Sequence, residues 1–362
     1  MSKKFLFLLF IPLSYIISFC LSHYPSVIEN YYSNTFNNTI IKLLSRLTNC
    51  VPFSVFELMV IASFLGLLIY LVYTLFLTLT KPNKRRRLTN LLANLSMIGS
   101  ILYALFVLLW GLNYNRISFY ESANIPILQY STTELANLYA YLVQQCNDLK
   151  LKTSSNSEGV FDYPGSVSDL FKAAPAGYTE AAKMYPTLSG TYGLPKPIFF
   201  SELLNYTMIT GVYSPFTGEA NVNVNVPEVT LVFTTMHEMA HQRGYASEDE
   251  ANFIAFMTCI THNDPHFQYA GYLSALGYVN HALAKYDRET LIELNQNLSD
   301  EVIIDMRYKS DFWKNYEGPV ESMASHVNNT YLQLNGVTDG VHSYGRMVDG
   351  LLGYYETTLN NQ

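Results

Sequence analysis

Residues 234–253 read TTMHEMAHQRGYASEDEANF, and this stretch decides how the rest of the chain is interpreted. His237 and His241 are four residues apart, so a helix would place both imidazole rings on one face. Glu238 directly follows the first histidine. The apolar neighbours are Val232, Phe233, Met236, Met239 and Ala240. They predict a buried helix, in which two histidines and a glutamate need partners because unpaired buried polar groups cost free energy.

The spacing H-E-x-x-H is that of a metal site in which two histidines bind the ion and the glutamate acts as general base. Zinc binds imidazole nitrogens in a tetrahedral arrangement, and a catalytic zinc takes three protein ligands and a water molecule. We therefore predict a Zn²⁺ cofactor held by His237 and His241. Glu238 is the predicted catalytic base that activates the water.

The third ligand is predicted to follow the helix. Gly244 predicts the end of the helix, because glycine readily takes the left-handed conformation that ends many helices. A chain reversal there would bring an acidic segment back toward the histidines. In that segment Glu248 and Asn252 share a helix face. Glu248 is the predicted ligand, Glu250 is the alternative, and Asp249 is expected to be solvated.

The string Glu248-Asp249-Glu250-Ala251-Asn252 resembles the E-x-x-A-[DN] element of gluzincins, H-E-x-x-H peptidases whose third ligand is a glutamate. The resemblance implies that Glu248 is the ligand and that Asn252 supports a histidine ligand by hydrogen bonding. The gap after the second histidine is shorter than in thermolysin-like enzymes. The glycine turn is more like that of metzincins, but their third ligand would fall near Ser247, a poor metal ligand.

Three apolar stretches precede this region, at residues 5–22, 55–80 and 91–113. A helix of about 20 apolar residues crosses a bilayer, so we expect three transmembrane helices. The first stretch has a basic start and a short apolar core, as a cleaved signal peptide has. The length of that core and the absence of a small-x-small cleavage site favour its retention.

The basic residues predict the orientation. Lys3 and Lys4 precede the first stretch, and KPNKRRR (81–87) links the second to the third. We therefore expect a multi-pass protein of the cell membrane, with a cytoplasmic N-terminus and everything after Tyr114 outside. The chain beyond the third stretch has 13 basic and 27 acidic residues, a net charge of −14. Such a charge argues against nucleic acid as a partner.

The pattern beyond the third stretch is mainly helical. Apolar spacing predicts helices over residues 132–152, 167–184, 228 onward, 267–285 and 289–306, and two helices within 320–358. We predict a membrane region, residues 1–114, followed by an α+β zincin-like domain, residues 115–362. This domain is expected to be mainly α with a small β-sheet.

A strand is predicted over residues 219–226. Valines at 222, 224 and 226 alternate there with asparagines at 221, 223 and 225. The asparagines are expected to face outward or toward a cleft. In gluzincins a strand at this place lines the cleft and can hold a peptide by main-chain pairing. A plain sheet edge is the alternative.

Four segments carry a wider resemblance: GLNYNR (111–116), GVYSPFTGEANVN (211–223), HEMAHQRGYASEDEANF (237–253) and SYGRMVDGLL (343–352). Through them the chain resembles a family of uncharacterised bacterial membrane proteins with N-terminal membrane helices and a predicted zinc-peptidase domain outside. The resemblance implies a hydrolase, namely a membrane-anchored metallopeptidase of gluzincin type. Its partners would be extracytoplasmic peptides or proteins as substrates, and the lipid bilayer.

Hydrolysis of a peptide bond also needs a donor to the oxyanion that forms when hydroxide attacks a carbonyl. Tyr344 and Arg346, beside glycines late in the chain, are the predicted catalytic donors, and Tyr213 and His326 are further candidates. Two alternatives remain open: a non-peptidase zinc amidase or hydrolase, and a membrane sensor or scaffold with a structural or vestigial zinc site. An intact Glu238 argues against the second, because a structural site does not need that residue.

Overall fold

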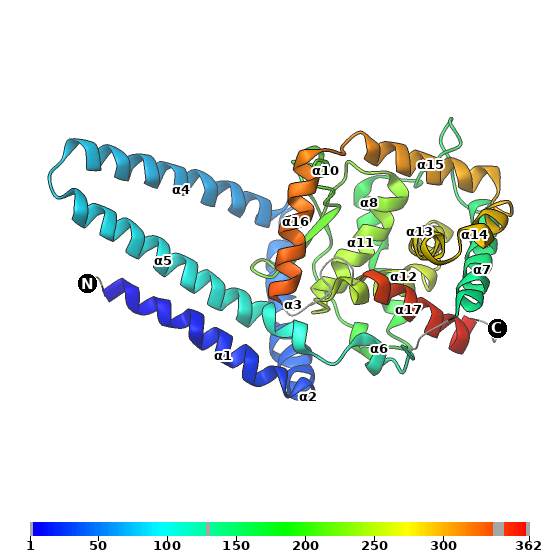
Figure 1. The fold of residues 1–362 in the computed structure, drawn as a ribbon, viewed down its shortest axis with the longest axis horizontal. Coiled ribbons are helices and arrows are strands. Elements are labelled where there is room, and N and C mark those ends of the chain that lie inside the picture. Colours follow the sequence, from blue (N-terminus) through cyan, green and yellow to red (C-terminus); the bar gives the residue numbers. More distant parts are fainter. Residues whose placement is uncertain (1–2, 128–130, 336–343, 360–362) are drawn as a thin grey trace.

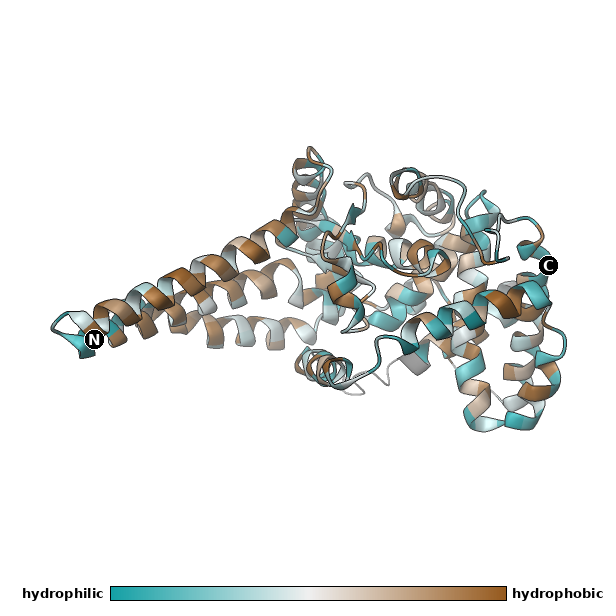
Figure 2. Cartoon of the chain, turned by 90° about the horizontal axis from the view of Figure 1, so that it is seen from above, coloured by the Kyte–Doolittle hydropathy of each residue, from teal (hydrophilic) through white to brown (hydrophobic). Residues whose placement is uncertain are grey.

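The computed structural model describes residues 3–127, 131–335 and 344–359. It is mainly helical, with a small three-stranded sheet and three long apolar helices at the N-terminus, so the predicted fold class is confirmed. In Figure 1 the apolar helices extend together from one side of a helical body, which we call the C-terminal domain. Figure 2 shows that they are mostly apolar, with hydrophilic residues at the end farthest from the domain.

Three helices are long and apolar enough to cross a membrane: Lys3–Ser22, Val55–Thr80 and Lys84–Leu109. The first joins the 3-10 helix η1 (Lys3–Leu9) to α1 (Phe10–Ser22), and the other two are α4 and α5. Helix α5 begins earlier than the predicted residue 91. It runs through the basic link as far back as Asn83, whose left-handed backbone (φ 66°) forms the turn.

The other elements follow in chain order. Between α1 and α4 lie α2 (Pro25–Val27), the π-helical η2 (Ile28–Asn37) and α3 (Asn38–Thr48). After α5 come η3 (Gly111–Asn115), α6 (Phe119–Ser122), α7 (Thr132–Lys150), α8 (Val167–Ala173), α9 (Pro175–Ala181), η4 (Pro186–Leu188), β1 (Lys196–Pro197), α10 (Ser201–Asn205), β2 (Gly211–Ser214) and β3 (Glu219–Val222). The last are α11 (Glu228–Gln242), α12 (Glu248–Ile260), α13 (Pro265–Tyr286), α14 (Arg288–Asn295), α15 (Asp300–Lys314), α16 (Pro319–Leu334), α17 (Tyr344–Tyr354) and η6 (Tyr355–Leu359).

Local chemistry explains most helix boundaries. Ser131 and Glu134 form a capping box at the start of α7, in which each side chain satisfies a backbone N–H of the other residue. The helix expected over 167–184 is divided into α8 and α9 at Pro175, which occupies the first turn of α9. The helix expected over 289–306 is divided into α14 and α15, because Ser299 caps a new helix.

The sheet has the order β1-β3-β2, so β3 is its central strand and β2 is an edge strand. Strand β3 pairs parallel with β1 and antiparallel with β2. The expected outward or cleft-facing asparagines are wrong for two of the three positions, because Asn221 and Asn223 are fully buried. The Asn221 amide donates to the carbonyl of Val212 in β2, and the Asn223 amide donates to the carbonyl of Ile209 in the loop before β2.

The segment between α1 and α4 packs on the C-terminal domain. Arg116, just after α5, donates two hydrogen bonds to the Glu29 carboxylate, at 2.8 and 2.7 Å, and both residues are buried. Farther along the segment, the N–H of Gly193 donates to the Ser45 hydroxyl (3.1 Å). Residues 25–54 therefore belong structurally with the domain that we predicted to begin at residue 115.

Helix α4 is fixed to the sheet at its first turn. Glu219 of β3 is almost fully buried, and its carboxylate accepts from the N–H groups of Val55 and Phe56 (3.1 and 2.8 Å). A carboxylate at a helix N-terminus satisfies free N–H groups and favours the helix dipole. The spans are thus held rigidly against the part of the domain that contains the sheet.

The buried pair of Arg116 and Glu29 gives a stability prediction. Glu29→Gln leaves a buried guanidinium without its counter-charge, so we expect the free energy of unfolding to fall by about 3–5 kcal/mol. Chemical denaturation of the full-length protein in detergent measures it. The control is Asp311→Asn, which removes an exposed pair with Lys314 and should cost less than about 1 kcal/mol. Equal small losses in both variants would show that the buried pair does not hold the segment.

Candidate metal centre

Helix α11 carries the two histidines. It starts directly after Pro227, and it is buried along nearly its whole length between the sheet, α12 and α13. His237 and His241 lie on one face, with ring centroids 4.6 Å apart. Nδ1 of His241 lies 2.6 Å from the carbonyl oxygen of Tyr245. In the neutral imidazole this contact assigns the proton to Nδ1 and leaves Nε2 as the ligand atom, as in many metal sites.

The turn after α11 brings the third side chain into place. Gly244 has φ +82°, the left-handed region that favours glycine, and its N–H donates to the carbonyl of His241 (2.8 Å). Arg116 donates to the carbonyls of Arg243 and Gly244 (3.3 and 3.1 Å), and its guanidinium lies over the Tyr245 ring. The turn is therefore held by a residue from the end of the last span.

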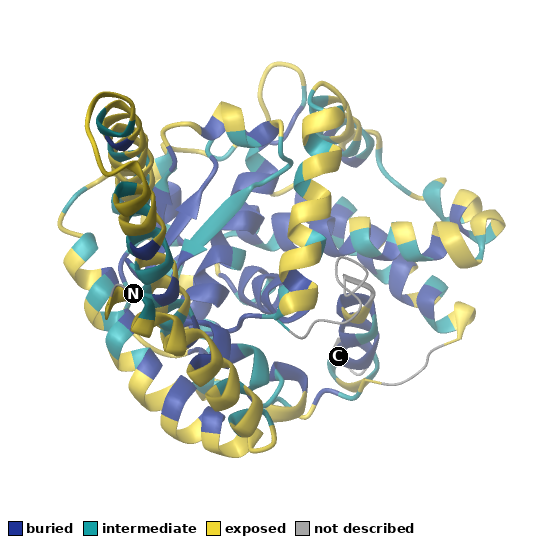
Figure 3. Ribbon diagram, turned by 60° about the vertical axis from the view of Figure 1, so that its left-hand side comes forward, coloured by how far each residue is buried: buried dark blue, intermediate teal, exposed yellow. Residues whose placement is uncertain are grey.

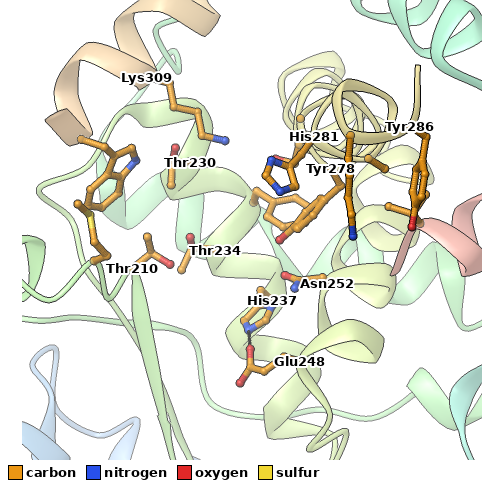
Figure 4. A pocket seen from close by; sticks show the side chains of 18 residues that line it. Thr210, Thr230, Thr234, His237, Glu248, Asn252, Tyr278, His281, Tyr286 and Lys309 are labelled. Atoms are coloured by element: carbon orange, nitrogen blue, oxygen red, sulfur yellow. Dashed lines mark ion pairs between the residues drawn. The ribbon is translucent and has the colours of Figure 1, made fainter. Parts of the chain in front are cut away.

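Glu248, the first residue of α12, meets the histidines. Its Oε2 lies 3.3 Å from Nε2 of His237, and its Oε1 lies 3.5 Å from Nε2 of His241. One ligand atom from each of the three residues lies within 4.8 Å of the others, so the group could hold a metal ion. Figure 4 shows the Glu248 carboxylate directed at His237 at the edge of a pocket. The predicted set His237, His241 and Glu248 is thus assembled.

Burial and charge set the ionisation of the group. Burial opposes charge on Glu248, but the two histidines outweigh it and hold the pKa of this carboxyl well below its usual range. Burial lowers the pKa of His241, but Glu248 raises it more, to about 9. Burial raises the pKa of Glu238 to about 7, against the effect of the histidines. The group therefore combines a carboxylate that stays ionised, Glu248, with a carboxyl that exchanges protons near neutral pH, Glu238.

Two buried polar atoms at this group lack a hydrogen-bond partner among the described residues, Oε2 of Glu238 and Nδ1 of His237. Glu238 lies against the backbone of Gly211 so closely that a Cβ there would be 2.6 Å from its Cγ. An unpaired carboxylate oxygen beside two imidazoles and a second carboxylate is costly unless a cation or water completes the site. The donor set of two nitrogens and one carboxylate fits a divalent metal ion of the zinc class.

The metal group lies where two pockets meet. We call the larger one, of about 940 Å³, the distal pocket; it is lined by α11, α12 and α13. We call the other, of about 550 Å³, the proximal pocket; it is lined by β2, α16 and the residues that follow α5. His237 and Glu248 line both. Both pockets therefore border the metal group.

The structure separates the two carboxylates that the sequence left as alternatives. Glu250 accepts a hydrogen bond from the N–H of Phe119 (2.8 Å), and burial raises its pKa to about 8. It lies outside the metal group. The expectation that Asp249 is solvated is wrong: it is buried. The reason is that α12 packs against α11 on one side and α17 on another, so both of its flanks are covered.

The other predicted site residues do not all lie at the metal group. Asn252 lines the distal pocket beside His237 and Glu248, but within the described part of the chain it makes no hydrogen bond to either histidine. Arg346 lines neither pocket of the metal group; it pairs with Asp249, the residue after Glu248 (3.6 Å). Tyr344 is the first residue of α17, and its side chain lies outside the described residues.

The two further candidates for the oxyanion donor, Tyr213 and His326, differ in their distance from the site. Tyr213, on the edge strand β2, lines the proximal pocket together with the metal group, and its hydroxyl is buried without a partner in the described structure. Its ring centroid is 6.4 Å from that of His241. His326 lies on the exposed side of α16 and does not line the cleft. Of the oxyanion candidates with described side chains, only Tyr213 reaches the site.

Comparisons with known proteins place the chain in a family. Residues 32–352 match the model of a family described as "Protein of unknown function (DUF3810)". The chain belongs to the DUF3810 family. No curated protein and no solved structure matches it. The matched range contains α4, α5 and the whole metal group.

Sequence reasoning missed the aromatic residues that wall the proximal pocket. Trp110 and Tyr114 follow α5, and Tyr331 comes from α16. Trp110 packs its ring 5.6 Å from that of His241, and its Nε1 donates to the Tyr331 hydroxyl (3.2 Å). In this DUF3810 chain the segment GLNYNR contained only Tyr114 of these three residues, and their roles depend on contacts more than a hundred residues away in sequence.

Metal content tests the assignment of the third ligand. Glu248→Gln removes the anionic ligand, so we expect affinity for zinc to fall by more than about 100-fold, since even outer-shell partners contribute 10–100-fold. Glu250→Gln, two residues away, should retain the metal. Elemental analysis of full-length protein after dialysis against a weak chelator measures both. Loss of metal in Glu250→Gln alone would overturn the assignment.

Proposed function

We propose that this protein is a membrane-anchored zinc metallopeptidase whose C-terminal domain lies outside the cytoplasm. The observation that carries the proposal is the convergence of His237, His241 and Glu248 beside the buried Glu238, at the border of two pockets. The orientation is supported by the basic residues of the link between α4 and α5, which favour the cytoplasmic side.

The donor set supports zinc as the resident metal. Two imidazole nitrogens and one carboxylate leave a fourth position, as catalytic zinc sites do and structural ones do not. When bound, zinc would polarise a substrate carbonyl and lower the pKa of a water molecule toward ~7. His237, His241 and Glu248 would hold it, and the contact between His241 and the Tyr245 carbonyl would keep that imidazole in the binding tautomer.

Glu238 is assigned the role of general base and acid. Its pKa of about 7 allows it to accept a proton from the attacking water and return it to the leaving nitrogen at neutral pH. Gly211 confines its side chain on the side of β2. Tyr213 is assigned as the donor to the developing oxyanion, because this residue lines the same pocket and its buried hydroxyl has no partner among the described residues.

A peptide substrate is supported by the shape of the cleft. Gly211, Val212 and Tyr213 of the edge strand β2 line the proximal pocket beside the metal group. An edge strand can bind an extended peptide by main-chain pairing. The distal pocket on the other side of the metal group offers room for residues beyond the scissile bond. An amidase acting on a compact substrate would not need both pockets.

Loss of the general base gives the main test of the proposal. Glu238→Gln should lower peptide hydrolysis by about 10²–10⁴-fold, because the variant no longer transfers protons. Zinc content should be unchanged, since Glu238 is not among the ligands. Mass spectrometry of a peptide library incubated with full-length protein measures cleavage.

Tyr213→Phe serves as a second variant in the same assay, and we expect a loss of about 10²-fold with zinc retained. If the zinc-loaded wild type cleaves no peptide, and no small amide either, the hydrolase proposal fails. The sensor or scaffold then becomes the better interpretation.

The close contact at Gly211 gives an independent prediction. In Gly211→Ala the new Cβ would lie 2.6 and 2.7 Å from Cγ and Cδ of Glu238 and would displace this side chain. A displacement of about 1 Å costs on the order of 10²-fold in rate, so we expect a loss of that size in kcat with zinc retained. The control is Gly99→Ala in α5, where a Cβ meets no atom within 4 Å. Full activity in Gly211→Ala would contradict the role of Glu238.

A further inference from the structure

Helix α16 carries an apolar stripe that the described residues leave uncovered. Val320, Met323, Val327 and Leu334 fall on one side of the helix, because they are separated by three, four and seven residues. They are 56%, 71%, 61% and 82% exposed. Large apolar side chains gathered on one exposed face mark an interaction surface. We call these four residues the α16 stripe.

The rest of α16 has a different character. Ser325 and Asn328 line the proximal pocket, so one flank of the helix forms a wall of the cleft. Ser322, His326 and Thr330 are exposed on the remaining side and are polar. Figure 3 shows α16 as a long, mostly exposed helix in front of the domain. An apolar stripe opposite a polar side is typical of helices that lie in a membrane interface.

The position of α16 along the spans is fixed by its contacts. Tyr331 packs against Phe106 of α5, with ring centroids 6.3 Å apart, and accepts a hydrogen bond from Trp110. The 22 residues Leu88–Leu109 of α5 extend roughly 33 Å, which matches the ~30 Å hydrocarbon core. Trp110 therefore falls at the interface opposite the basic link, where tryptophan and tyrosine are enriched.

The other edge of this surface lies at the start of α4. Phe199 and Leu203, near α10, are 84% and 62% exposed. The N–H of Phe199 donates to the Glu57 carboxylate in the first turn of α4 (2.8 Å). These apolar side chains thus lie at the same level as the beginning of a span. In Figure 1 α16 lies crosswise to α4 and α5, at the place where both join the domain.

The contacts select lipid as the occupant of this surface. Helix α16 contacts the candidate span α5 through Tyr331 and Phe106. The stripe therefore adjoins the side of α16 that meets the span. Helix α16 contains no lysine or arginine, so it has no basic cluster that would select anionic headgroups. Apolar insertion into a neutral interface is the matching mode of binding.

We propose that α16 is an interfacial helix whose stripe inserts into the bilayer leaflet nearest the C-terminal domain. The proximal pocket then opens at the level of the lipid headgroups, between α16 and the end of α5. The class of substrate follows from this position, a step that rests on the proposed peptidase function. Such a site acts on polypeptides held at the membrane surface by a lipid anchor or a membrane-spanning segment.

Spin labels at single cysteines test the position of α16. The full-length protein, with the exposed Cys20 and Cys50 replaced by serine, is reconstituted in phosphatidylcholine vesicles. Labels at Met323→Cys and Val327→Cys should be more accessible to oxygen, which concentrates in lipid, than to a water-soluble nickel chelate. Labels at the matched positions Ser322→Cys and His326→Cys should show the reverse.

Equal accessibility to the nickel chelate at all four positions would overturn the interfacial helix. Broadened spectra that report label–label contact at 323 and 327 would instead assign the stripe to a second copy of the chain, and would overturn lipid as its occupant. Both readouts are independent of hydrolysis and therefore of the proposed function.

A separate experiment in the same vesicles tests the class of substrate. One cleavable peptide is offered free in solution and with a lipid anchor. We expect the anchored form to be cleaved at least ~10-fold faster, because anchoring raises its effective concentration at the cleft. Met323→Ser/Val327→Ser should reduce this preference and leave cleavage of the free peptide unchanged. Equal rates on both forms in the wild type would reject the substrate class while the peptidase function stands.

Discussion

The left-handed turn at Gly244 is the constraint on which the rest of this structure depends. It reverses the chain between α11 and α12 within a few residues, and only this reversal brings Glu248 to the two histidines. Its carbonyls are held by Arg116, whose charge is balanced by Glu29. The geometry of the metal group is therefore connected by direct contacts to the segments that flank the membrane spans.

The segments that flank the spans consequently form part of the site. Two spans separate residues 25–54 from the C-terminal domain in sequence, so both parts lie on the same side of a bilayer, as their packing requires. Trp110 and Tyr114, which directly follow α5, wall the cleft beside His241. The same tryptophan directly follows α5 and lines the proximal pocket.

The sequence was sufficient for features that depend on local chemistry. The spacing of His237 and His241, the glycine after them and the apolar runs predicted the metal group, its helix and the spans, because each signal lies within a few residues. It was insufficient where distant segments decide the environment. The sequence predicted Asp249 and Asn221 to be exposed, yet helices and strands from elsewhere in the chain cover them.

The same limit explains the residues around the cleft. Glu248 and Glu250 have equal chemistry, and only the packing of Phe119 against α12 assigns one to the metal group and the other to a backbone N–H. Tyr331 and Trp110 meet across more than two hundred residues.

For the same reason this fold is completed late in synthesis. Glu29 is made early, but its partner follows two spans, and the turn they stabilise comes later still. Assembly of the site must therefore wait for insertion of the α4–α5 hairpin, and such non-local contacts fold slowly.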